Sequence, residues 1–251
     1  MDGEEPDEWS AIAEPWAELW GGLGAPAWAA VAAVTGIGPG VRVLDVGCGT
    51  GDFLAYAHAQ GAVVAGADPA PGMIAYARRR VPAADLRLGE LPALPWAGGR
   101  FDVVTAFNAL QFAADRVAGL VEMARVARAG GFVAVANWAE SVRNDLHRVE
   151  EAIARAAGEE PLPDDETRVP GGLEWLFEAA GLTLVAVGLV ETPWCAPDEE
   201  ALVRGVLLGE DREAIAAQRS TVVTAAGPFR LPSGGYRFRN AFRYAVGRTA
   251  G

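Results

Sequence analysis

The sequence predicts an α/β fold built on a doubly wound, largely parallel sheet. From residue 41 onward, short apolar runs alternate with stretches of helical periodicity, which is typical of parallel strands joined by crossover helices. The first run, residues 41–46, ends in a glycine-rich turn that opens a helix. The next run ends in an acid, Asp68, which follows Asp45 at about the 20-residue spacing of nucleotide-binding βαβ units.

The turn itself, residues 45–51 (DVGCGTG), indicates which kind of ligand it meets. Glycine has no Cβ, so the backbone N–H groups of such a turn can approach a ligand closely. An acid at the end of the second strand is placed to accept ribose hydroxyls, which indicates a cofactor that contains adenosine. A dinucleotide site would need G-x-G-x-x-G, and a phosphate loop would need Gly-Lys-Ser/Thr. Here Asp45 would repel a pyrophosphate and suits an ammonium group.

These residues resemble the signature motif of class I S-adenosylmethionine (SAM)-dependent methyltransferases, of the methyltransferase type 11-like, small-molecule kind. Four further segments resemble that family's motifs in the family's order: 63–73 (VVAGADPAPGM), 89–96 (GELPALPW), 101–104 (FDVV) and 125–131 (RVARAGG). The resemblance runs from Val41 to Trp138. It implies a Rossmann-like sheet of seven strands in which the last strand is antiparallel.

Three positions depart from the family pattern. Glu90 replaces the usual Asp, which keeps a hydrogen-bond acceptor but lengthens its reach. Ala129 replaces the usual Pro before Gly130, a change that we expect to matter little. Gln111 stands where some relatives carry a His, so a histidine base cannot be transferred from the family to this position.

The resemblance implies a SAM site, with S-adenosylhomocysteine (SAH) as the product, at the carboxyl ends of the strands. Asp45 would act on the ammonium group of SAM, and Asp68 would accept two ribose hydroxyls. Met73 would pack on the adenine, with ordinary core packing as the alternative. The implied cofactor-binding residues are Asp45, Gly47, Cys48, Gly49, Gly51, Asp68, Pro69, Met73, Glu90, Leu91 and Asn108.

Methyl transfer from a sulfonium is an in-line displacement, and the protein mainly has to hold the acceptor and the methyl carbon in line and away from water. A general base is needed only where the acceptor must lose a proton. The catalytic candidates are Asn108 and Gln111 after the fourth strand, and His147, whose imidazole suits a base. A surface position on a helix is the alternative for His147, and we interpret His58 as structural or exposed.

Periodicity together with glycine and proline positions predicts the other elements. We expect strands at about 41–46, 62–67, 84–88, 101–107, 132–137, 182–190 and 236–246, and helices at about 51–60, 71–80, 115–128, 142–157 and 173–180. The predicted parts are an N-terminal helical lid (1–40), the SAM-binding core (41–138), and the rest of the sheet (139–251) with helical substrate-cap inserts near 139–169 and 194–226.

Four tryptophans are candidates for the substrate pocket. Trp9, Trp16 and Trp20 share one helical face in the segment before the first strand, and Trp138 ends the fifth strand. An amphipathic helix packed on the sheet and an aromatic lid over the cofactor and acceptor both explain the first three. Aromatic side chains bury a large area and can attract a sulfonium through cation–π contact.

The composition of the chain indicates which kinds of partner it can bind. The net charge of −12 disfavours DNA or RNA, since few cations are available to neutralise phosphates. No apolar run reaches the length of about 18 residues that suggests a membrane span, and the acidic start lacks the basic residues of a signal peptide. Two cysteines and two histidines make a weak case for a metal site, and the paired carboxylates that metal-dependent methyltransferases carry after the fifth strand are missing from the sequence. We therefore expect no metal. We expect a cytoplasmic monomer or homodimer.

The sequence thus predicts a methyltransferase acting on a small, mostly apolar acceptor of aromatic, alkaloid-like or polyketide-like type in secondary metabolism. Relatives that methylate nitrogens of nucleic acid or protein carry an Asn-Pro-Pro-Tyr-type motif after the fourth strand. Residues 107–110 read FNAL here, so the resemblance does not indicate that activity. Two alternatives stay open. One is a SAM-binding enzyme that catalyses a rearrangement or cyclisation without methyl transfer, and the other is a non-catalytic SAM-binding subunit.

Overall fold

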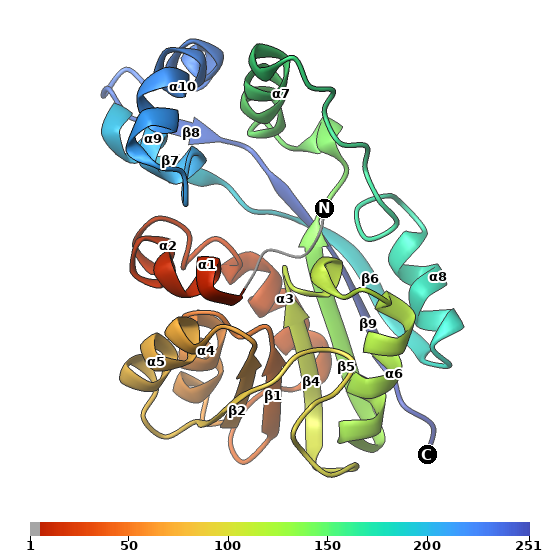
Figure 1. The fold of residues 1–251 in the computed structure, drawn as a ribbon. Helices are drawn as coiled ribbons and strands as arrows, with labels where there is room; N and C mark the ends of the chain where they lie inside the picture. The colour runs from red at the N-terminus through yellow and green to blue at the C-terminus, as the bar shows by residue number, and fades with distance from the viewer. Residues whose placement is uncertain (1–5) are drawn as a thin grey trace.

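The computed structural model describes residues 6–251, and these form a seven-stranded sheet in the order β3-β2-β1-β4-β5-β9-β6 (Figure 1). Strands β1 to β5 run parallel, and β9 lies antiparallel between β5 and β6. The strands are β1 (Arg42–Val46), β2 (Val63–Asp68), β3 (Asp85–Leu88), β4 (Phe101–Phe107), β5 (Ala127–Trp138), β6 (Thr183–Glu191) and β9 (Ala241–Arg248). The predicted Rossmann-like fold with an antiparallel last strand is confirmed.

Helices cover both faces of this sheet, and strand alternation decides which residues meet them. Val43 faces α3 (Ala25–Thr35), α4 (Asp52–Ala59) and α5 (Pro71–Arg80), in one cluster with Leu54 and Ile74. Leu44, the next residue, faces α6 (Arg116–Val126) and α8 (Gly172–Ala179), in a second cluster with Leu120 and Phe177. The two apolar layers explain why the central strands read as continuous apolar runs.

Short local signals fix several helix ends. Asp115 caps α6, because its carboxylate accepts a hydrogen bond from the N–H of Ala118 at 2.9 Å. Asp198 caps α9 (Glu199–Val206) and Asp211 caps α10 (Arg212–Ala225) in the same way. Pro71 occupies the first turn of α5, where a missing N–H costs nothing.

A second, smaller unit, the cap, sits beyond the carboxyl ends of β4 and β5 (Figure 1). It comprises α7 (His147–Ala157), α9, α10, the 3-10 turns η2 (Ser141–Arg143) and η3 (Gly227–Phe229), and the two-stranded sheet of β7 (Trp194–Ala196) and β8 (Tyr236–Phe238). Its apolar centre includes Val149, Leu202, Val222 and Phe238.

The N-terminal helices α1 (Pro6–Ala11) and α2 (Ala13–Leu19) lie between the α4–α5 layer and the cap (Figure 1). Helix α1 packs on α5, and α2 packs on both α5 and α9. Helix α3 instead packs on the sheet, where Val31 meets Ala134 and Val246. The expected lid therefore divides into a bridging pair of helices and a sheet-covering helix, and its first five residues lie outside the described ones.

Two sequence-based element predictions were wrong in detail. The strand expected at 236–246 is two strands, since β8 pairs with β7 in the cap and β9 enters the main sheet. Its alternation continues across the break because Phe238 and Phe242 are buried in different cores. Residues 194–196, expected to be helical, form β7. Because this strand pairs with β8, which lies far along the chain, the sequence around residues 194–196 does not predict it.

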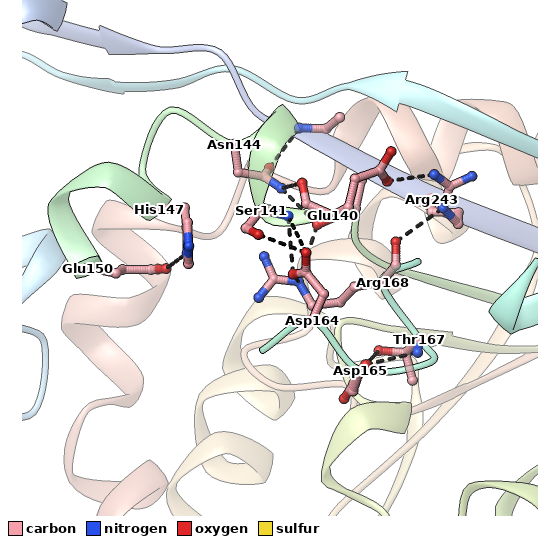
Figure 2. Close-up of polar contacts among 12 residues, drawn as sticks. Glu140, Ser141, Asn144, His147, Glu150, Asp164, Asp165, Thr167, Arg168 and Arg243 are labelled. Carbon is pink, nitrogen blue, oxygen red and sulfur yellow. Dashed lines mark hydrogen bonds and ion pairs between the residues drawn. The ribbon is translucent and has the colours of Figure 1, made fainter. Parts of the chain in front are cut away.

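Four chain segments connect the cap to the sheet and its covering helices, and hydrogen bonds of buried residues join three of these segments. Asn144 donates to the carbonyls of Ala139 (2.8 Å) and Glu140 (2.9 Å) and accepts from the N–H of Ala241 (3.0 Å). The Thr192 N–H donates to the Asn240 carbonyl at 2.7 Å. Figure 2 shows the polar contacts around Asn144. We call this three-segment junction (residues 139–146, 191–193 and 239–241) the neck.

The structure also bears on membrane association. Among the helices of residues 6–251, none combines the length and apolar character needed to cross a bilayer. The longest of the cap helices, α10, has 14 residues.

Replacing Asn144 should weaken the neck. In Asn144→Ala, two carbonyls and one N–H lose their buried partner, so we expect the free energy of unfolding to fall by about 2–4 kcal/mol. Urea unfolding followed by circular dichroism measures this change. Val142→Ala, at a 91% exposed position of the same segment, is the control and should stay within about 0.5 kcal/mol of the parent. Equal losses in both variants would contradict this role for Asn144.

Candidate functional site

The glycine turn adopts the conformation that its sequence indicates. Gly47, Gly49 and Gly51 have φ values of 68°, 50° and 80°, in the left-handed region that glycine tolerates best. A Cβ on Gly47 would lie 2.4 Å from the Cβ of Ala109, in the loop that follows β4. The turn therefore requires glycine at position 47 both for its backbone angle and for the close approach of this loop.

Asp68 ties the turn to the end of β2. Its Oδ2 accepts the Gly49 N–H at 2.8 Å and its Oδ1 accepts the Ala70 N–H at 2.9 Å. The side chain is buried, which raises the pKa of the carboxyl, while both N–H groups act in the opposite direction. Each oxygen keeps a further lone pair, so the carboxylate can accept two more hydrogen bonds from a ligand.

Asp45 lies beside it at the end of β1 and is 3% exposed. The pKa of its carboxyl is raised to about 8, because burial and the charge of Asp68 raise it by more than the 2.7 Å hydrogen bond from the Thr105 hydroxyl lowers it. No arginine contributes to this shift. A cation placed near the pair would favour the charged carboxylate, so the two acids form an electrostatic site for a positive group.

Cys48 packs against the sheet from within the turn. A Cβ on Gly66 of β2 would lie 2.8 Å from its Sγ, so the thiol fills the space over that glycine. Burial and the charges of Asp68 and Asp45 raise the pKa of the thiol well above its usual range. The side chain therefore contributes volume, and its backbone belongs to the turn.

The segments predicted to meet adenine lie next to this turn. Met73 is buried at the start of α5 together with Ala13 of α2 and Ala70. Pro69 and Glu90 are exposed, and Leu91 is half-buried against the core. Trp96 anchors the segment 89–96, because its Nε1 donates to Asp85 at 3.1 Å.

Asn108 and Gln111 follow β4 and contact each other. The Nε2 of Gln111 donates to the Oδ1 of Asn108 at 3.1 Å. Asn108 has a φ of 52°, and its N–H donates to the Ala136 carbonyl of β5 at 2.7 Å. These bonds place both carboxamides at the carboxyl ends of β4 and β5. The glycine turn is next to them, because Gly47 of the turn packs closely against Ala109.

His147 starts α7 in the cap and faces acids of its own helix. Its Nδ1 lies 3.3 Å from Glu150 and its Nε2 lies 3.5 Å from Glu151, as Figure 2 shows for the first pair. Among residues 6–251 the polar partners of its imidazole are these two glutamates, and neither Asn108 nor Gln111 is one of them. Its catalytic role stays a prediction. His58 is exposed on α4.

The predicted pocket tryptophans form one aromatic chain. The ring centroids of Trp9 and Trp16 are 5.3 Å apart, those of Trp16 and Trp20 are 6.1 Å apart, and those of Trp20 and Trp138 are 6.4 Å apart. Trp20 also stacks on Trp194 at 4.5 Å, and its Nε1 donates to the Gly205 carbonyl. Trp20 is therefore part of the contact between α2 and the cap.

Sequence reasoning missed two aromatic members of this chain. Trp194 lies on β7, and its Nε1 donates to the Leu19 carbonyl at 2.8 Å. Phe112, at the end of the turn η1 (Leu110–Phe112), is 58% exposed and lies 5.8 Å from Trp9. Phe112 directly follows Gln111, a candidate catalytic residue. This neighbourhood in the sequence was a signal that could have identified Phe112 as part of the site.

Residues 6–251 also bear on metal ligation. This part of the chain brings no three side chains of His, Cys, Asp or Glu together in a way that could hold a metal ion. The two free cysteines, Cys48 and Cys195, lie in the glycine turn and on β7 respectively.

Comparison with known proteins agrees with this geometry. Residues 44–135 match the family model described as a methyltransferase domain, which covers β1 to β5 and the whole acidic site. A SAM dependent methyltransferase from Aquifex aeolicus aligns with 97% of this chain and 98% of its own, at 17% identity and a TM-score of 0.56. At that identity the likeness shows the class I methyltransferase fold.

Curated relatives match only part of the chain. A demethylmenaquinone methyltransferase of Beutenbergia cavernae is 42% identical over 103 residues, which cover 41% of this chain and 43% of the relative. The chain thus spans less than half the length of the curated relatives it matches. The 4+2 cyclase SpnF shares the fold at 18% identity and a TM-score of 0.57, over 89% of this chain and 80% of its own.

The raised pKa of Asp45 predicts a pH-dependent stability. The unfolded carboxyl titrates near pH 4, so between about pH 4 and pH 8 the unfolded chain releases a proton that the folded chain keeps. Stability should therefore fall as the pH rises through this window and level off above it. Urea unfolding at pH 5 and pH 8 should show a difference on the order of a few kcal/mol that shrinks in Asp45→Asn. An unchanged difference in the variant would rule out Asp45 as its source.

Gly72 of α5 packs so closely against Ser10 of α1 that a larger residue at position 72 should weaken the contact between these two helices. The Gly72 N–H donates to Ser10 Oγ at 3.0 Å, and a Cβ on Gly72 would lie 2.5 Å from the Ser10 carbonyl O. In Gly72→Ala this contact must open, so chymotrypsin should cleave near Trp9 several-fold faster. Gly38→Ala, where the added Cβ meets its nearest atom at 3.7 Å, is the control and should be cleaved at the parental rate. Equal rates in both variants would show that α1 tolerates the contact.

Proposed function

We propose that this chain is a SAM-dependent methyltransferase that transfers a methyl group to a small, mostly apolar metabolite by in-line displacement. The observation that carries this proposal is the pair of buried acids beside a glycine turn, with Asp68 hydrogen-bonded to that turn and Asp45 at a raised pKa. The pair fits a ligand that carries both hydroxyls and a positive charge, and SAM has both. The methyltransferase domain supports the same assignment.

In this proposal each part of SAM meets a different segment. Asp68 accepts the ribose hydroxyls through its remaining lone pairs, and Asp45 holds the ammonium group. The backbone at Gly47, Cys48, Gly49 and Gly51 surrounds the amino-acid portion. Met73 lies against the adenine with Pro69, while Glu90 and the N–H of Leu91 bind its edge. When bound, SAM supplies the activated methyl group.

The protein then contributes position more than chemistry. Asn108 and Gln111 stand at the carboxyl end of β4 and orient the acceptor toward the methyl carbon. A base is required only for an acceptor that must lose a proton, and His147 is the proposed candidate. Its contacts with Glu150 and Glu151 mean that it must turn away from its own helix to reach an acceptor at β4.

The acceptor pocket is proposed to lie between the aromatic chain and the ends of β4 and β5. Trp9, Trp16 and Trp138 supply apolar walls, and Trp20 supports them from the contact between α2 and the cap. An aromatic, alkaloid-like or polyketide-like acceptor suits these walls. The name of the demethylmenaquinone relative agrees with an aromatic acceptor. We place the reaction in cytoplasmic secondary metabolism, carried out by a monomer or homodimer without nucleic acid, membrane or metal.

A second candidate is a cyclisation or rearrangement that uses SAM without consuming it. The observation in its favour is the fold shared with a 4+2 cyclase. The same residues would hold SAM in both cases. The two functions differ in whether SAH accumulates.

Incubation with methyl-labelled SAM and a panel of aromatic, alkaloid and polyketide metabolites tests the proposal. We expect label in one product together with an equal amount of SAH. In Asp68→Ala both should fall at least about 100-fold, because the ribose loses its acceptor and the turn loses its anchor. Glu178→Ala, an exposed acid on α8, is the matched control and should keep parental activity.

Each outcome of that assay separates the candidates. Product isomerised without label or SAH would replace methyl transfer by the cyclase-type function. Equal activity in Asp68→Ala and the parent would remove Asp68 from the cofactor site.

A further inference from the structure

Three residues with carboxamide side chains lie where β4 and β5 end. Asn108 and Gln111 follow β4, and Asn137 is the penultimate residue of β5. The hydrogen bond from the Asn108 N–H to the Ala136 carbonyl joins the two strand ends immediately before Asn137. Asn137 therefore lies beside the candidate acceptor position in the sheet.

Asn137 shares a face of the sheet with Gln111. Side chains alternate along β5, and Val133 and Val135 pack in the core under α6 and α8. Asn137, two residues beyond Val135, lies on that same face. Leu110 of η1 packs in the same core, which brings its neighbour Gln111 to this side of β5.

Two of the three carboxamides carry buried polar atoms without a partner among residues 6–251. Asn137 is fully buried, and neither its Oδ1 nor its Nδ2 has a hydrogen bond. Gln111 donates through Nε2 to Asn108, while its buried Oε1 has no partner. Buried amides are normally hydrogen-bonded, because their lost hydration is not otherwise recovered. These atoms are therefore suited to binding a polar group that is not part of this chain.

The backbone after Asn137 is held in place, as Figure 2 shows. Glu140 accepts from Arg243 at 2.6 Å, and the Ser141 N–H and hydroxyl donate to Asp164 at 2.9 and 2.7 Å. Asn144 donates to the Ala139 carbonyl. Because these bonds fix the segment, Asn137 is positioned for a ligand before binding.

The charges around these carboxamides are already paired. Arg243, which lies opposite Asn137 in the strand register, binds Glu140. Arg116 donates to the Gln111 carbonyl at 3.3 Å and also binds Asp165 and Glu166 at 2.8 and 2.7 Å. The buried Nε of Arg116 has no partner among residues 6–251, but the charge of this guanidinium is balanced by the two acids. The ligand group that suits these balanced charges is a neutral polar one.

We propose that Asn137 and Gln111 bind the polar group of the methyl acceptor, and that this group is a neutral hydroxyl on an aromatic ring. The Gln111 oxygen accepts the hydroxyl proton, and the Asn137 amide donates to the hydroxyl oxygen. The exposed ring of Phe112, next to Gln111 and 5.8 Å from Trp9, supplies a flat surface for the ring. This assignment rests on the proposed function and narrows the acceptor to a phenol-like class.

Binding of three naphthalene probes in the presence of SAH, measured by calorimetry, tests this assignment. The probes share one ring system and differ at a single substituent: 1-naphthol is neutral and polar, 1-methylnaphthalene is apolar, and 1-naphthoate is charged. We expect 1-naphthol to bind at least about tenfold more tightly than either of the others, as one or two buried hydrogen bonds would provide.

Two variants test whether Asn137 is the source of the preference for 1-naphthol. In Asn137→Leu the preference for 1-naphthol over 1-methylnaphthalene should fall to near one, while SAH affinity stays parental. Gln218→Leu makes the same chemical change at another carboxamide with an unpartnered buried oxygen, on α10 in the cap, and should keep the preference. Asn137→Leu should also resist urea at least as well as the parent, because an apolar side chain replaces an unpaired buried amide.

Several results would overturn the assignment. These are a retained preference in Asn137→Leu, a parental preference for the apolar or charged probe, or a clear loss of stability in Asn137→Leu, which would mean that the amide has a structural partner. Should Asn137→Leu fail to fold, Asn137→Thr, with a shorter polar reach, must lose the preference instead. Selective binding of 1-naphthol without any methyl transfer in the labelled assay would reject the proposed function and leave standing only that Asn137 and Gln111 bind a phenol-like hydroxyl.

Discussion

The arrangement of the site depends on the hydrogen bond between the Gly49 N–H and the Asp68 carboxylate. This bond joins the turn after β1 to the end of β2, and it forms because Gly49 takes a left-handed φ that aims its N–H at the acid. Gly47, in the same turn, leaves room for Ala109 from the loop after β4. Three segments that are distant in sequence therefore meet at one point, and the carboxamides after β4 are placed by the same contact.

Acids at the two edges of the sheet differ in their electrostatic surroundings. At the amino ends, Asp102 is paired with Arg42 and Arg128, which hold the pKa of its carboxyl well below its usual range. At the carboxyl ends, burial raises the pKa values of Asp45 and Asp68, and no arginine is among the causes of either shift. The first arrangement stabilises the fold, whereas the second costs stability. Such a cost, confined to one edge, is characteristic of a binding site.

The sequence predicts those parts of the molecule that short segments define. The turn at residues 45–51 and the acid at position 68 are local signals, and the structure brings them together as expected. The break between β8 and β9 and the strand β7 were missed, because Asn240 and Trp194 take their roles from distant partners in the neck and in α2. The unpaired state of Asn137 was equally hidden, since it depends on how η1 and the residues after β5 fold over it. The residue type of Asn137 and its position in a strand do not predict which distant segments cover it.

The parts that cover the site are held to the rest of the molecule by different kinds of contact. The cap joins the sheet through the neck, where Asn144 and Thr192 bind buried backbone groups and leave little freedom. Helix α2 is fixed to the cap by indole hydrogen bonds from Trp20 and Trp194. Helix α1 meets α5 through the Ser10–Gly72 hydrogen bond and a small apolar cluster. Since hydrogen bonds at a partly exposed helix are easier to open than those in a buried junction, the α1–α5 contact is the one of the three that opens at the lowest cost in stability.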